Sequence, residues 1–207
     1  MADGVLGKKI GMTQIFRESG EAMSVTVVKT DSCVVSQLKT EKRDGYNACQ
    51  LAFKEKKEIH SNRAETGHFK KAGLAPFGFV REIKPDNADN YKLGQKIVLD
   101  QLFKEGDRVK VSGRSIGKGF AGVIKRHGFS GGPAGHGSHF HRAPGSIGMC
   151  AWPAKTEKGK KLPGQMGNKK HTVMNLEIVR IDSEKGLLLL KGAVPGAKGG
   201  FLVIEQC

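Results

Sequence analysis

The sequence predicts a mainly β fold with three parts: a β-barrel, a small α+β insertion and a long basic extension of mostly non-regular structure. Short β-branched segments recur at close spacing between glycine and proline turns, which is typical of barrels and sandwiches. We favour the barrel because closure leaves no exposed strand edge. A mixed segment and a glycine-rich basic segment interrupt the strands and predict the other two parts. A chain of 207 residues is long enough to bury a core and a subdomain.

The first third of the chain is predicted to consist mostly of strands. Residues 4–16 form an extended segment punctuated by glycines. Residues 23–29 and 32–38 are β-branched runs, and Thr30-Asp31 between them suits a tight turn. The two runs therefore predict a β-hairpin.

The next part is predicted to be the mixed insertion, at about residues 55–100. An apolar-rich strand at 46–53 precedes it, and the abruptly polar run 54–58 marks a surface connection. Residues 62–72 combine alanines, charges and spaced apolar groups, which predicts a short helix with Gly73 as its C-cap residue. The other elements expected here are a strand at 77–83, a loop at 85–90 and a strand at 95–99.

The body of the protein is predicted to comprise residues 1–111 and 171–207, with the insertion inside the first part. Strands return on both sides of the basic segment and rejoin the barrel. The strands expected there lie at 107–111, 172–182, 186–191 and 201–205, with a turn at 194–196.

The middle of the chain, residues 112–170, differs in kind. It contains eleven basic residues and one acidic residue, Glu157, and so carries +10 of the net charge of +15. It also contains fourteen glycines and few large apolar side chains. Packing of this segment on itself is not expected to offset its ordering entropy, which is roughly 1–2 kcal/mol per residue.

Two interpretations of this basic segment compete. Its composition suits a disordered linker. It also suits an extension that threads into nucleic acid, because glycines allow close approach to phosphates, prolines stiffen the path and aromatic rings stack on unpaired bases. We prefer the extension, since a pure linker rarely needs aromatic residues, and these are Phe120, Phe129, Phe140 and Trp152. Running out and back, the segment reaches at most about 90–100 Å at 3.3 Å per residue.

Gly128–Gly132 matches G-x-S-x-G, the nucleophile elbow of serine hydrolases, with Ser130 as the nucleophile. That chemistry needs a strained turn between a strand and a helix. Here Lys125-Arg126-His127 precedes the motif, and Pro133 follows where the helix has to begin. We therefore do not expect an enzyme.

The histidines of the segment raise the question of a metal site. Histidine side chains so spaced could bind a tetrahedral zinc ion. No pair of cysteines accompanies these histidines, however, and Cys150 is a single cysteine. We therefore expect no metal and no cofactor. Hydrogen bonds to phosphate or 2′-hydroxyl groups and stacking on bases are the preferred roles. Gly113–Gly119 resembles a phosphate-binding loop, but it has three residues between its glycines where a Walker A motif needs four.

Composition also indicates the kind of partner and the compartment. A net charge of +15 predicts a polyanionic partner, nucleic acid before membrane. The N-terminal residues form no apolar signal region, and the conspicuous apolar run 187–190 is far shorter than a membrane helix, so we expect neither export nor a membrane span. The cysteines form no CxxC pair, which indicates reduced thiols in a cytoplasmic protein; they are Cys33, Cys49, Cys150 and Cys207.

Several short motifs, spread in order along the whole chain, together resemble the bacterial form of the family of large-subunit ribosomal protein three. Each motif alone is weak, but their number and order are specific. They are Leu6–Phe16, Asp44–Tyr46, Gly67–Phe69, Gly117–Gly122, His141–Gly148, Lys158–Lys161, Gly164–Gly167 and Leu190–Gly196.

The resemblance implies a translation-protein-type β-barrel and a structural constituent of the large ribosomal subunit, in the cytoplasmic ribosome. It implies binding to large-subunit ribosomal RNA, an early role in subunit assembly, and an extension directed at the peptidyl transferase centre. Neighbouring ribosomal proteins are the other expected partners, with no membrane and no small-molecule substrate. The residues expected to bind RNA are Arg114, Lys118, Lys125, Arg126, His127, His136, His139, His141, Arg142, Lys155, Lys158, Lys160, Lys161, Lys169 and Lys170.

The tip nearest the catalytic RNA is expected within residues 145–153, and its residues are Gly148, Met149, Cys150, Ala151 and Trp152. Many bacterial relatives carry a Gln-Asn-Gln run there that includes a methylated glutamine. This chain has Met149-Cys150-Ala151 instead, so we expect that modification to be absent. A dissociable translation factor built on the same barrel is the second hypothesis, and an enzyme at Ser130 or the histidines is the third.

Overall fold

The computed structural model describes residues 3–17, 19–30, 33–85 and 91–207. It confirms the mainly β class. The chain divides into two compact units. We call Met1–Ser115 with Lys170–Cys207 the body, and Ile116–Lys169 the extension unit. In the described residues, no helix has the length and apolar character needed to cross a membrane.

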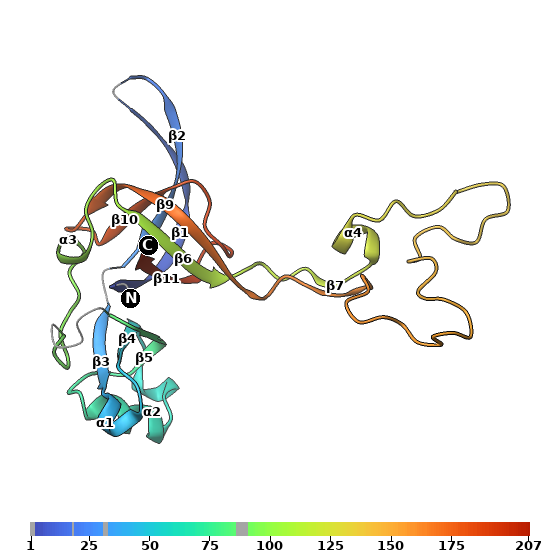
Figure 1. Cartoon of the computed structure of the whole chain (residues 1–207). Helices are drawn as coiled ribbons and strands as arrows, with labels where there is room; N and C mark the ends of the chain where they lie inside the picture. Colours follow the sequence, from blue (N-terminus) through green and yellow to red (C-terminus); the bar gives the residue numbers. More distant parts are fainter. Residues whose placement is uncertain (1–2, 18, 31–32, 86–90) are drawn as a thin grey trace. The chain divides into compact units, whose positions relative to one another are not determined.

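Six antiparallel strands of the body close into a barrel in the order β1-β11-β6-β9-β10-β2 (Figure 1). Alternation of buried and exposed residues fits this arrangement: in β10, Leu188 and Leu190 are buried while Lys191 is exposed. The strands are β1 Gly4–Phe16, β2 Ala22–Lys29, β6 Arg108–Arg114, β9 Lys170–Asp182, β10 Leu187–Lys191 and β11 Phe201–Gln206.

The predicted hairpin between residues 23–29 and 32–38 is wrong. Both edges of β2 are occupied inside the barrel, one by β1 and the other by β10. A strand has only two edges, so none is left for the next segment. Asp31 of the expected turn and Ser32 at the start of the second run lie outside the described residues.

The small mixed part of the body is built on a three-stranded sheet of order β3-β4-β5 (Figure 1). Its strands are β3 Val34–Lys39, β4 Ala48–Glu55 and β5 Phe77–Ile83. The sequence pattern places β3 and β4 in the barrel body and predicts that the insertion begins near residue 55. The register corrects this, because β4 pairs with β3 on one edge and with β5 on the other.

Short helical segments accompany this sheet: α1 Glu41–Asp44, the 3-10 turn η1 Glu58–His60, and α2 Arg63–Lys70. The predicted helix at 62–72 is confirmed in α2. A capping box starts it, in which Asn62 accepts from the backbone of Glu65 and Glu65 accepts from that of Asn62. The C-cap is Lys71, and Gly73, the expected cap, follows with φ +66°.

The strand predicted at 95–99 is also wrong. Lys96 forms one isolated bridge with Val34, and the chain then enters α3, Leu99–Leu102. Of the apolar residues that suggested a strand, Leu99 begins this turn of helix and is 5% exposed, whereas Val98 is 45% exposed. Of the loop predicted at 85–90, residues 86–90 lie outside the described residues.

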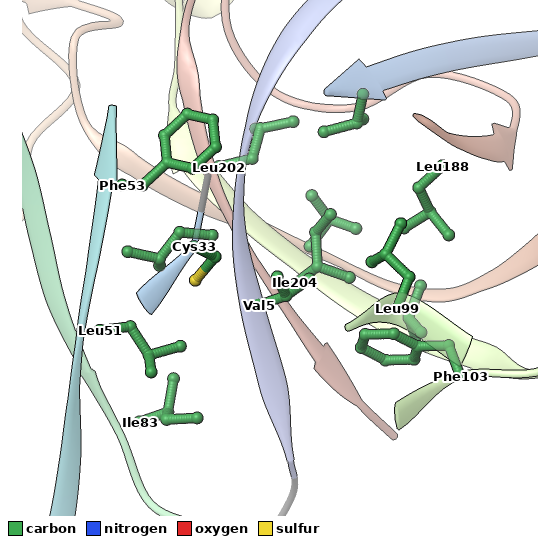
Figure 2. Close-up of a cluster of buried hydrophobic side chains, with 14 of the residues drawn as sticks. Val5, Cys33, Leu51, Phe53, Ile83, Leu99, Phe103, Leu188, Leu202 and Ile204 are labelled. Carbon is green, nitrogen blue, oxygen red and sulfur yellow. The ribbon is translucent and has the colours of Figure 1, made fainter. Parts of the chain in front are cut away.

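One hydrophobic core joins the barrel to the three-stranded sheet (Figure 2). Val5 and Ile204, paired between β1 and β11, contribute from the barrel, and Leu51 and Ile83 contribute from the sheet. Phe103, at the end of α3, is 2% exposed in the same cluster. The body therefore holds its two sheets together by shared apolar burial.

The four thiols differ in burial, which predicts their reactivity. Cys33 and Cys49 are buried, and desolvation raises the pKa of each to about 12, whereas Cys150 and Cys207 are exposed. Since the thiolate is the nucleophile, we expect iodoacetamide at pH 8 to modify only Cys150 and Cys207 in the folded protein. Peptide mass spectrometry of native and denatured samples measures this, and rapid native labelling of Cys33 contradicts it.

Candidate nucleic-acid interface

The base of the extension unit is a two-stranded ladder. Strands β7 Gly119–Ala121 and β8 Gly164–Met166 pair antiparallel, and the backbone of Lys118 donates to the carbonyl of Met166 at 2.9 Å. Gly167 has φ +70°, and a Cβ there would lie 2.0 Å from the carbonyl oxygen of Ile116. Only glycine permits this close return of the chain.

A short helix, α4 Val123–His127, contributes side chains that stabilise this base of the extension unit (Figure 1). The Arg126 guanidinium donates to the carbonyl oxygen of Leu162 at 2.5 Å, and the His127 Nε2 lies 3.1 Å from that same oxygen. Gly164 leaves room for this arginine, because a Cβ there would lie 2.9 Å from its Nη1. Sequence patterns give no signal for this clamp, since its acceptor is a backbone carbonyl.

Beyond the base, residues 129–161 form no helix or strand in the structure. Few of their backbone N–H groups donate within the unit: those of Gly132, Ser138, Phe140 and Lys160 do so. Gly132 packs so closely on Phe140 that a Cβ there would lie 1.9 Å from its carbonyl oxygen. The distal chain therefore folds back locally but has little hydrogen bonding of its own.

Of the fifteen residues predicted to bind RNA, only Arg126 and His127 are half-buried, and the other thirteen are exposed. The clamp to Leu162 occupies these two residues, so their contacts to the rest of the unit stabilise the base. Arg114 and Lys170 lie in β6 and β9 of the body. The structure thus places the remaining predicted residues on the surface of the extension unit.

Seven exposed cations of the extension unit form no salt bridge with an acidic residue that the structure describes. Every salt bridge found among the described residues lies in the body, such as Lys39 with Glu82 at 2.7 Å and Lys56 with Glu65 at 2.9 Å. None involves Lys118, Lys125, Arg142, Lys155, Lys158, Lys160 or Lys161. No acidic residue that the structure describes compensates these seven charges, so they are available to an external polyanion.

The aromatic residues of the unit divide into two kinds. Phe120 and Trp152 are 77% and 89% exposed, although both have large apolar surfaces. The ring centroids of Phe129 and His127 lie 6.1 Å apart, and Phe140, although 37% exposed, packs against Gly132 and Gly145. Exposed rings among uncompensated cations are the combination that binds unpaired bases and their phosphates.

All five residues of the predicted tip are exposed. A shallow hollow beside them is lined by Ile147, Met149, Pro153, Lys155 and Lys160, among others. The structure therefore leaves the tip open on an apolar and cationic surface.

Ser130, His136, His139 and His141, the candidate residues of the chemical alternatives, lie in chain without helix or strand. Ser130 follows α4, and residues 129–135 after the helix contain no further helix, unlike a nucleophile elbow. Over the described ranges, no group of three or more His, Cys, Asp or Glu side chains is placed to hold a metal ion. His141 instead has its Nδ1 3.0 Å from the carbonyl oxygen of Pro133.

Comparison with known proteins gives consistent matches. Residues 82–201 match the family model of ribosomal protein L3. A large ribosomal subunit protein uL3 of Syntrophotalea carbinolica is 52% identical over 206 residues, covering 100% of this chain and 98% of the relative. The uL3 protein of Oceanobacillus iheyensis is also 52% identical, with the same coverage, and that of Geobacter metallireducens is 51% identical.

Proposed function

Because the chain belongs to the ribosomal protein L3 family, whose members are structural and non-enzymatic proteins of the large ribosomal subunit, we propose that it binds large-subunit ribosomal RNA through the extension unit. As a member of this family it is a constituent of the ribosome, which is cytoplasmic in bacteria. The observation that carries the proposal is a set of exposed cations in the extension unit that form no salt bridge with any described residue: Lys118, Lys125, Arg142, Lys155, Lys158, Lys160 and Lys161.

The proposed mechanism starts from phosphate neutralisation. Each lysine or arginine that meets a phosphate releases counterions, so binding has a strong entropic and salt-dependent component. With about six to ten such contacts, log K falls against log salt with a slope near −4 to −9. Phe120 and Trp152 add stacking on unpaired bases, which selects irregular RNA over uniform duplex.

The division of the chain gives each part a role in this proposal. The barrel, which we assign to the translation-protein type, and the three-stranded sheet form the rigid anchor, residues 1–111 and 171–207. Residues 112–170 form the RNA-penetrating element, and the clamp of Arg126 and His127 on Leu162 fixes its base. RNA then supplies the hydrogen-bond partners that the distal residues 129–161 lack.

We further propose that residues 148–152 approach the peptidyl transferase centre and that the protein joins the subunit early in assembly. An extension that orders only against RNA is most easily placed before the RNA around it has closed, which favours early binding. Met149-Cys150-Ala151 provides no glutamine at the tip, so glutamine methylation there is not expected.

Cosedimentation tests the function. Large subunits from the source organism are pelleted through sucrose containing 1 M ammonium chloride, and the chain is quantified by mass spectrometry. We expect it to remain at one copy per subunit, because a threaded extension cannot dissociate without unfolding the RNA. Loss of the chain in the wash supports the dissociable translation factor instead and contradicts a structural role.

A further inference from the structure

A second cationic and aromatic surface lies on the body. Phe79 of β5 and Phe201 of β11 stack with ring centroids 4.6 Å apart and an interplanar angle of 12°. The Arg81 guanidinium lies over the Phe79 ring at 4.7 Å, and the Lys54 ammonium lies over the Phe201 ring at 5.8 Å. We call these four residues the cation–aromatic stack. It joins the three-stranded sheet to the barrel.

The backbone at Lys54 is arranged to bring its side chain to the stack. Successive side chains of a strand normally point to opposite faces. The side chains of Phe53 and Lys54 nevertheless both approach Phe201. The ring centroids of Phe53 and Phe201 lie 6.3 Å apart, and the Lys54 ammonium lies over the Phe201 ring. Lys54 has φ +63°, the left-handed region that non-glycine residues rarely adopt. Unfavourable backbone of this kind is kept where the surrounding structure imposes it, often at binding sites.

Further positive charge adjoins the stack. Lys8 of β1 pairs directly with Phe201 on one side and with Lys29 on the other, and paired residues share a face of the sheet. Within the described part of the chain, Lys8, Lys54 and Arg81 form no salt bridge. By contrast Lys39, in the same three-stranded sheet, is neutralised by Glu82. Lys54 and Arg81 are also exposed.

We propose that the cation–aromatic stack is a second RNA-binding site, in which an unpaired base stacks on the open face of the Arg81 guanidinium while adjacent phosphates contact Lys54 and Lys8. The guanidinium is restrained from two sides: its Cζ lies over the Phe79 ring, and its Nη1 donates to the carbonyl oxygen of Val80 at 2.8 Å. A planar guanidinium held in this way offers a surface on which a base can stack, as arginine side chains do in RNA recognition. This inference rests on the proposed function, because it takes large-subunit ribosomal RNA as the ligand.

Substitution at Arg81 separates stacking from charge. The full chain and its variants are titrated by filter binding against a transcript of the large-subunit ribosomal RNA at several salt concentrations. Arg81→Lys keeps the charge and loses the plane, so we expect affinity to fall about fivefold or more with an unchanged salt slope. Arg81→Gln is expected to lose at least as much affinity and to flatten the slope by about one.

The matched control is Lys71→Gln, which removes an exposed cation at the end of α2 in the same subdomain. It is expected to change affinity less than twofold. If Arg81→Lys binds like the wild type while the wild type binds tightly, the stack is not an RNA site and the proposed function stands. If the wild-type chain does not bind the transcript, the proposed function and this inference fail together.

A measurement on the wild-type chain tests whether the cation–aromatic stack binds RNA, even if an Arg81 variant does not fold. Lysine acylation is followed by mass spectrometry on the free chain and on its binary complex with the transcript. We expect RNA to protect Lys54 and Lys8 several-fold and to leave Lys71 unchanged. Equal reactivity of Lys54 in both samples overturns the proposal, as does protection that appears only in whole subunits, which indicates a protein partner.

Discussion

Replacing Lys158, Lys160 and Lys161 together with alanine is expected to weaken binding to large-subunit ribosomal RNA severely and to flatten the salt slope by about 2–3 units. All three side chains are exposed and form no salt bridge with any residue that the structure describes. Each loss therefore removes a phosphate contact without breaking a contact inside the protein. Filter binding at several salt concentrations measures the slope.

The control for this triple variant carries the same change in charge on the body: Lys42, Lys57 and Lys71, all exposed, replaced with alanine. We expect it to retain most of the affinity, and both variants to melt at nearly the wild-type temperature. A large loss of thermal stability in the Lys158 variant contradicts the account, because it makes the cluster part of the fold.

Replacing Ile204 with alanine is expected to have the opposite effect, a loss of stability without a change in the salt slope. Ile204 is fully buried in β11, paired with Val5 on one side and Val111 on the other. Removing it leaves a cavity in the shared core, which costs about 2–5 kcal/mol. For a chain of this size that lowers the melting temperature by roughly 5–15 °C.

Calorimetry or urea unfolding measures this loss, and Ile59→Ala is the matched control. Ile59 is 90% exposed, so the same truncation there is expected to change stability by less than about 0.5 kcal/mol. Equal effects of the two substitutions contradict the placement of Ile204 in the core.

The sequence allowed the identity of most strands to be predicted, but not their partners. The β-branched and apolar alternation of β1, β2, β5 and β10 is a local signal, and these strands lie where it indicated. Pairing depends on which edges remain free after distant strands have docked. The pairing of β2 with β10, about 160 residues later, had no local signal, so a hairpin with β3 was predicted instead.

The candidate site shows the same division between local and non-local information. Charge, glycine content and the spaced aromatic residues marked residues 112–170 without any knowledge of contacts. The clamp on Leu162 was not predictable, because it depends on a backbone carbonyl brought close by the ladder of β7 and β8. The cation–aromatic stack was missed for a similar reason, since Phe79 and Phe201 lie far apart in the sequence.

The central claim is that the distal extension gains its order from RNA. Amide hydrogen exchange of the full chain, free and bound to the large-subunit ribosomal RNA transcript, tests it most directly. Without RNA, residues 129–161 are expected to exchange near their intrinsic rates while the barrel strands exchange slowly, and RNA is expected to slow the distal residues at least about tenfold. Exchange of residues 129–161 as slow as that of the barrel in the free protein contradicts the claim.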